Sequence, residues 1–93
     1  MPIDYYIQQT IDRLNDYKRL CTAGAWQAAV VERSLAVLTP EEFEVIWRHY
    51  IDRDAGFSST VARKLNCNLR TVYRLQNEAL RKLTISMFGP IDY

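Results

Sequence analysis

Residues 60–83 read TVARKLNCNLRTVYRLQNEALRKL, and this stretch decides the fold that we expect for the chain. Two short helical runs lie on either side of the corner Asn66-Cys67-Asn68. Asn66 can adopt the left-handed conformation that Gly usually supplies, and Asn68 is a favourable N-cap for the second run. The apolar positions that would pack the two runs together are Val61, Leu65, Val72 and Leu75. Two helices joined by a three-residue corner are typical of a helix-turn-helix.

The second run has two different faces when its residues are placed on a helix at ~100° per residue. The apolar face comprises Val72, Leu75, Ala79 and Leu83. The nearly opposite face comprises Arg70, Arg74, Asn77 and Arg81, with Tyr73 at its edge. Arg70 and Arg74 form a like-charged i,i+4 pair, which is mildly unfavourable in an isolated helix. An anionic partner would offset that cost, whereas a face that is merely solvated would mix signs of charge.

In a helix-turn-helix the second helix enters the major groove, where Arg recognises guanine and Asn recognises adenine. The residues expected to read bases are Asn68, Leu69, Arg70, Tyr73, Arg74 and Asn77. The residues expected to contact phosphates are Ser59, Thr60, Arg63, Lys64, Thr71, Arg81 and Lys82. For Tyr73, contact with DNA and ordinary amphipathic packing are equally supported. Arg74→Ala should cost ~1–3 kcal/mol of specific binding, and Arg81→Ala should mainly flatten its salt dependence.

The N-terminal part, residues 1–38, is predicted to form two helices. Apolar residues at i, i+3, i+4 and i+7 spacing predict a helix from Ile3 to Cys21, with Gly24 as its stop. A second helix over residues 25–38 is apolar on two sides. The first side holds Trp26, Ala29, Val30 and Val37, and the second holds Val31, Leu35 and Leu38. Such a helix is central in a bundle or half-buried by a second subunit, and both alternatives stay open. For the first helix, with Tyr5, Tyr6 and Tyr17, packing on the domain and a dimer surface also stay open.

Residues 39–88 begin with the clearest local signal, Thr39-Pro40-Glu41-Glu42, which predicts a capping box with Pro at the first helical position. The aromatic residues expected in the core are Trp26, Phe43, Trp47 and Tyr50. After Ile51 the run DRDAGFSS breaks the pattern, and Ser58 or Ser59 is expected to cap the next helix. The last helix should end near Phe88, before Gly89-Pro90 and a tail over residues 89–93. The prediction is an all-α fold of about five helices in one compact domain.

Composition is consistent with this prediction. The 93 residues are 48% hydrophobic and 25% charged, with three Gly and three Pro. The formal net charge is +1, but it is unevenly distributed. Residues 1–57 carry six Lys and Arg against nine Asp and Glu, whereas residues 58–93 carry six against two. The basic C-terminal third favours an anionic partner.

The sequence offers little for catalysis or metal binding. Cys21 and Cys67 are far apart, and with His49 as the single histidine they do not make a zinc set. No nucleophile or second base accompanies His49, which we expect at the surface or boundary, so we predict no enzyme activity and no cofactor. Both thiols are expected to be buried, which suits a reducing compartment. The N-terminus lacks a signal-peptide pattern, and no apolar run approaches the ~20 residues of a membrane span. A cytoplasmic protein without membrane contact is expected.

Two segments carry a family resemblance. LTPEEFEVIWRHYI at residues 38–51, followed by residues 60–83, resembles region 4 of bacterial sigma-70 factors, over roughly residues 38–84. With the short helical part before it, the chain is similar to small phage late-transcription regulators of the ArpU/RinA type. Asn66 replaces the usual corner Gly, and Asp54-Ala55-Gly56 lengthens the loop before the first helix of the motif. Sigma region 2 is missing, so promoter melting is not implied. The resemblance implies sequence-specific promoter binding, with contact to RNA polymerase as a further possibility.

The leading hypothesis is therefore a phage-type transcription regulator that binds double-stranded DNA as a homodimer paired through its two N-terminal helices. A protein-interaction module that docks on RNA polymerase is the alternative from another class. A DNA-packaging subunit similar to small terminases is the third hypothesis, and it would form rings.

Overall fold

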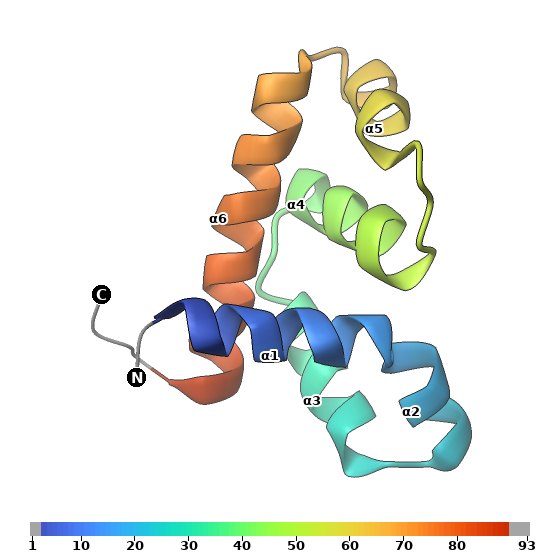
Figure 1. The fold of residues 1–93 in the computed structure, drawn as a ribbon, viewed down its shortest axis with the longest axis vertical. Coiled ribbons are helices and arrows are strands. Elements are labelled where there is room, and N and C mark those ends of the chain that lie inside the picture. Colours follow the sequence, from blue (N-terminus) through green and yellow to red (C-terminus); the bar gives the residue numbers. More distant parts are fainter. Residues whose placement is uncertain (1–2, 90–93) are drawn as a thin grey trace.

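The computed structural model describes residues 3–89, and these form helices and their connections only (Figure 1). The elements in order are α1 (Ile3–Asn15), α2 (Tyr17–Ala23), α3 (Trp26–Leu35), α4 (Pro40–Ile46), a π-helical turn (Trp47–Ile51), α5 (Phe57–Leu65) and α6 (Leu69–Phe88). The all-α prediction is confirmed, with six α-helices in this range in place of about five. Pro90 and the rest of the predicted tail lie outside the described residues.

Helix α6 is the element on which both halves of the molecule pack. In Figure 1 α1 crosses its C-terminal half, while α4 and α5 lie beside its N-terminal half. The larger apolar cluster joins α1, α3, α4, the π-helical turn and α6, and its buried members are Leu14, Val31, Leu35, Ile46, Tyr50, Ile51, Ala79, Leu80 and Leu83. Thr10 of α1 and Thr84 of α6 are fully buried and share a hydrogen bond of 2.9 Å between their hydroxyls. Here Tyr6 packs on Phe88 at 5.3 Å between ring centroids.

The predicted first helix is in fact two helices. The chain bends at Asp16, whose φ of −89° and ψ of −3° depart from helical geometry. Backbone hydrogen bonds from Asp16 to Asp12 and from Leu20 to Asp16 continue through the bend, which keeps α1 and α2 nearly contiguous. Gly24 ends α2 with φ +68°, as predicted. Cys21 on α2 is exposed, so the prediction that both thiols are buried is wrong for Cys21.

Helix α3 ends three residues before the predicted boundary, because the last turn is tightened by bonds from Val37 to Ser34 and from Leu38 to Leu35. Its two apolar sides have different environments. Val31 is fully buried and Leu35 is 5% exposed, whereas Trp26 is 67% exposed and Val37 51% exposed. The prediction that Trp26, the first residue of α3, lies in the core is therefore wrong.

Helix α4 begins with the predicted capping box, in which Thr39 and Glu42 exchange hydrogen bonds of 2.9 and 3.2 Å. The helix then widens into the π-helical turn, closed by a bond from Asp52 N–H to Trp47 C=O. Tyr50 is buried there, as expected. Phe43 is 39% exposed, so its assignment to the core is wrong, and it stacks on the partly buried Trp47.

Helix α5 starts earlier than the sequence suggested. Its first residue is Phe57, with Gly56 as N-cap, so neither Ser58 nor Ser59 caps it. The Asp54 carboxylate accepts a hydrogen bond from Gly56 N–H, which forms the turn that precedes the helix. The early start brings the Phe57 ring into the core at 7% exposure. None of the helices described is long and apolar enough to span a membrane.

Candidate nucleic-acid interface

The corner between α5 and α6 is built as predicted. Asn66 ends α5 in the left-handed conformation, with φ +54° and ψ +50°. Backbone hydrogen bonds from Asn66 to Arg63 and from Cys67 to Ala62 close the end of α5. Asn68 caps α6, because its Oδ1 accepts from the N–H of Thr71 at 2.9 Å and from the Thr71 hydroxyl at 3.0 Å. The corner therefore determines where α6 begins and how it leaves α5.

A second apolar cluster packs α5 against α4 and α6. Its buried members are Val45, Phe57, Val61 and Val72, and Ala62, Leu65, Cys67 and Leu75 pack around them. The predicted contact between Val61 of α5 and the apolar face of α6 is confirmed. Val72, Ala79 and Leu83 are fully buried, so the orientation of α6 about its own axis is determined by this face and by the larger cluster.

The opposite face of α6 is exposed, as the wheel predicted. Arg70, Arg74, Asn77 and Arg81 all lie at the surface. Together with Tyr73 and Glu78 they line a shallow groove of about 400 Å³ that runs along the helix. Leu69 is 48% exposed at the start of α6, and Tyr73 is 46% exposed while its ring meets Phe57 edge-on. Five of the six predicted base-reading residues therefore have side chains exposed on this part of α6. The sixth, Asn68, uses its Oδ1 to cap the start of the helix.

One carboxylate, that of Glu78, lies within this basic face. The helical wheel drawn from the sequence did not predict it there. Glu78 lines the groove, and its Oε1 is 3.6 Å from Arg74 Nη1. Both side chains are more than half exposed, and exposed i,i+4 pairs contribute only ~0.3–0.5 kcal/mol. Such a pair is weak enough for an anionic ligand to displace Glu78 from Arg74. The i,i+4 spacing in the sequence was the available signal for this contact.

The predicted phosphate-contacting residues fall into three groups. Ser59 and Arg63 are exposed on α5, and Arg81 is exposed on α6. Lys64 Nζ lies 3.1 Å from Glu44, and Lys82 Nζ lies 2.8 Å from the buried Glu42. In addition, Thr60 and Thr71 are half-buried. The pairing of the two lysines with carboxylates of α4 gives them a role in holding the helices together.

The carboxylates of α4 are stabilised as anions by these contacts. Hydrogen bonding from Arg48, and then from Lys64, holds the pKa of Glu44 below its usual range despite partial burial. For Glu42, burial acts to raise the pKa, but hydrogen bonds from Lys82 and Thr39 outweigh it and lower the pKa. Because the partners are 20 and 40 residues distant in the chain, no local pattern in the sequence predicts either lysine pair.

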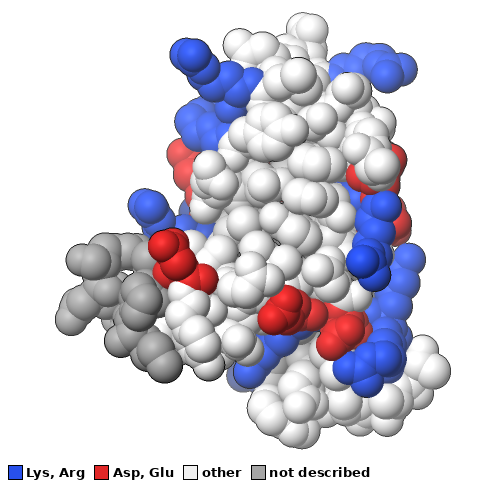
Figure 2. Space-filling model, viewed as in Figure 1, with Lys and Arg blue, Asp and Glu red and all other residues white. Residues whose placement is uncertain are grey.

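Basic side chains border one face of the molecule. Figure 2 shows Lys and Arg at one edge over α6 and at the other edge over α5, with Asp and Glu farther along both edges and uncharged residues between the edges in the upper part of the view. His49 is a boundary residue, as predicted. Its ring lies parallel to Phe57 with centroids 3.9 Å apart, and its Nδ1 is hydrogen-bonded to Gln76 of α6. The sequence did not predict this contact, which links the π-helical turn to α6, the candidate recognition helix.

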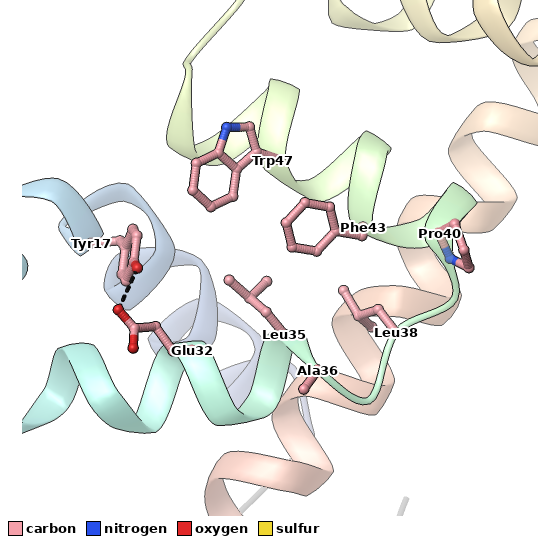
Figure 3. A pocket seen from close by; sticks show the side chains of 8 residues that line it. All are labelled: Tyr17, Glu32, Leu35, Ala36, Leu38, Pro40, Phe43 and Trp47. Atoms are coloured by element: carbon pink, nitrogen blue, oxygen red, sulfur yellow. Dashed lines mark hydrogen bonds between the residues drawn. The ribbon is translucent and has the colours of Figure 1, made fainter.

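A separate apolar groove of about 570 Å³ lies between α2, α3 and α4 (Figure 3). Phe43 and Trp47 stack at 5.5 Å between ring centroids and line one side, while Leu35 and Leu38 line the other. Tyr17 donates a hydrogen bond of 2.7 Å to Glu32 at its edge. Phe43 and Trp47, which line this groove, were predicted from the sequence to lie in the core.

Comparisons of the chain with models of known protein families, with curated proteins and with solved structures each found no match. The function of the basic face must therefore be inferred from its own side chains. These comprise several guanidinium groups and an amide in one exposed row, presented by a helix whose other side is fully buried.

Proposed function

We propose that the protein is a sequence-specific DNA-binding regulator of transcription, in which the exposed face of α6 enters the major groove. The observation that carries the proposal is the row Arg70, Arg74, Asn77 and Arg81, exposed along a helix anchored by a buried opposite face. Planar guanidinium groups suit guanine edges, and the amide of Asn77 suits adenine. The resemblance of residues 38–84 to sigma region 4 supports the same function and suggests promoters as the target.

The contacts of α5 fit this arrangement. In a helix-turn-helix the helix before the recognition helix crosses the sugar–phosphate backbone. Ser59 and Arg63 lie at the surface of α5 and offer a hydroxyl and a guanidinium for phosphates. Lys64 and Lys82, which are paired with Glu44 and Glu42, have a smaller part in the proposal than the sequence suggested.

The test is selection of bound fragments from the source genome at two salt concentrations. A sequence-specific regulator enriches a few intergenic sites that persist at the higher salt concentration. Uniform recovery that disappears with salt would leave only general attraction between charges and would contradict the proposal.

Arg74→Ala then tests the recognition helix on the best selected site. It should lose ~1–3 kcal/mol of binding free energy, measured by fluorescence anisotropy, and should relax the base preference at one position. Arg19→Ala is the matched control, because Arg19 is an exposed arginine of α2 with its own carboxylate partner, Asp16, at 3.0 Å. Equal affinity of Arg74→Ala and the unsubstituted protein for that site would rule out α6 as the reading element.

The apolar groove supports a second candidate, a module that docks on RNA polymerase or on another protein. Exposed aromatic side chains in a concave apolar surface are typical of protein-binding sites. A polymerase pull-down that survives Arg70→Glu with Arg74→Glu but is lost with Phe43→Asp would favour this function. The opposite pattern would favour the DNA-binding proposal.

A further inference from the structure

The basic row of α6 includes one acidic neighbour. Among the 20 residues of α6, Glu78 is the one acid, and it lines the same groove as Arg70, Arg74 and Asn77. Its Oε1 lies 3.6 Å from Arg74 Nη1, and the Glu78 and Arg74 side chains are 51% and 62% exposed. The tips of a carboxylate and a guanidinium are therefore presented together at the surface of the candidate recognition helix.

This ion pair differs from those that hold the helices together. Glu42 and Glu44 of α4 bridge to α6 and α5, and their side chains are 2% and 21% exposed. Glu78 pairs within its own helix and is half exposed. The order of the pair is also the less favourable one for helix stability, since an acid placed four residues before a base stabilises a helix better than the reverse. Stability therefore gives little reason for an acid at position 78.

An acid in a DNA-binding surface also has a cost. DNA carries one negative charge per about 1.7 Å of its axis, and its phosphates repel a carboxylate. An uncharged side chain at position 78 would let the groove attract DNA more strongly. A carboxylate suits such a surface where it meets a donor on the DNA, and in the major groove Glu accepts from the N4 amino group of cytosine.

We propose that Arg74 and Glu78 recognise one G·C base pair together, Arg74 through guanine and Glu78 through cytosine. The major-groove edge of this pair presents two acceptors, guanine N7 and O6, beside one donor, cytosine N4. A guanidinium has five N–H donors, so Arg74 can bind both acceptors and keep an N–H directed at Glu78. The carboxylate has further lone pairs for the cytosine donor. The ion pair is thus complementary to the whole edge of the base pair.

The same arrangement discriminates against other base pairs. An A·T pair presents the amino donor of adenine between two acceptors, adenine N7 and thymine O4. Arg74 then faces a donor, and Glu78 faces an acceptor that repels it. Specificity is a difference of affinities, and a repelled charge against the wrong partner increases it. The inference rests on the proposed function, since it requires α6 to enter the major groove.

A base-pair scan of the best selected DNA site tests the proposal. Each base pair is replaced in turn, and the affinities of the unsubstituted protein, Arg74→Ala and Glu78→Ala are measured by fluorescence anisotropy. The unsubstituted protein should lose roughly tenfold or more in affinity when the G·C pair is replaced. Both variants should lose their preference at that same pair and keep it at the others.

Asp12→Ala is the matched control for the scan. It removes an exposed carboxylate from α1, so it changes the net charge of the protein as Glu78→Ala does. It should keep the preference of the unsubstituted protein at every base pair. Circular dichroism checks that each variant is folded.

A modified base tests the contact with cytosine directly. A pyrimidinone that lacks the N4 amino group replaces that cytosine and leaves the guanine in place. The unsubstituted protein should bind the modified site roughly fivefold or more weakly than the natural site, because a hydrogen bond to a charged group is lost. Glu78→Ala should bind both sites equally. Equal binding of both sites by the unsubstituted protein would overturn the role of Glu78.

The scan separates failure of this inference from failure of the proposed function. If Glu78→Ala tightens binding equally on every DNA, Glu78 acts by repulsion alone and the inference is wrong. It is also wrong if Glu78→Ala keeps the full preference at the G·C pair. In both cases discrimination by the unsubstituted protein leaves the proposed function intact. An unsubstituted protein that discriminates no base pair would overturn both.

Discussion

At the scale of single residues, Glu42 combines several tasks in one side chain. It is 2% exposed, completes the capping box of α4 and accepts a hydrogen bond from Lys82 of α6. A buried carboxylate is stable only when it is well paired, and here Glu42 Oε1 accepts hydrogen bonds from the Thr39 backbone N–H at 2.9 Å and from Lys82 Nζ at 2.8 Å. Glu42 thereby ties the start of α4 to the middle of α6.

The lowered pKa of Glu42 predicts a specific pH dependence. The carboxylate contributes its full stabilisation above the unfolded pKa, near 4.5, and loses it as pH falls from there toward the folded pKa. Glu42→Gln should therefore lower the free energy of unfolding by ~1–3 kcal/mol at pH 7, with the difference shrinking below about pH 4.5. Urea unfolding across pH measures this. Glu41→Gln, at the exposed neighbouring position, should have little effect, and a pH-independent loss in Glu42→Gln would contradict the assignment.

At the scale of elements, α6 has 20 residues and performs different tasks along its length. Its N-terminal half packs on α5 and carries Arg70, Arg74 and Asn77. Its C-terminal half packs on α1 and α3 through Leu83 and Thr84. Because a single helix carries the basic face and packs on other helices along both of its halves, this packing determines the orientation of the basic face.

Arg81, farther along the same face, should act on DNA through charge alone. We expect Arg81→Ala to weaken binding nearly equally for all sequences and to reduce the slope of log K against log salt by about 1. Binding isotherms at four salt concentrations, on the selected site and on a scrambled one, measure both quantities. Lys18→Ala, on exposed α2, should leave the slope unchanged, and a change of base preference with Arg81→Ala would assign it to base reading instead.

At the scale of the whole molecule, two apolar clusters share α6. Val72 belongs to the smaller cluster and Ala79 and Leu83 to the larger, all on one helix face. A helix that contributes to both cores couples their unfolding. In a Trp26→Phe background, where Trp47 is the remaining tryptophan, we expect a single transition in which circular dichroism and Trp47 fluorescence coincide.

Phe57→Ala tests that coupling from the smaller cluster. Removing this 7%-exposed ring should cost ~3–5 kcal/mol and should lower the midpoints of both probes equally, although Trp47 packs on the other cluster. Phe43→Ala is the matched control, since Phe43 is 39% exposed and should lose only about 1 kcal/mol. Trp47 fluorescence that kept its midpoint while part of the helical signal was lost would show two independent units.

Much of the fold was predictable because its signals are local. The Thr39–Glu42 capping box, the left-handed Asn66, the Asn68 cap and the two faces of α6 each depend on residues within a few positions of one another. Several errors also have local causes. Asp54 shapes a turn that starts α5 at Phe57, and the helix predicted over residues 3–21 bends at Asp16.

The sequence by itself determined the all-α fold, the caps at Thr39 and Asn68, the left-handed corner at Asn66 and the basic row on α6, since hydrogen bonds and side-chain periodicity within a few residues decide these. Only the tertiary structure decided that Phe57 is buried while Trp26 and Phe43 are exposed, and that Lys64 and Lys82 meet Glu44 and Glu42. Burial and long-range ion pairs depend on which helix covers which face. That choice is made by the packing of all the helices together, and no short stretch of the chain contains it.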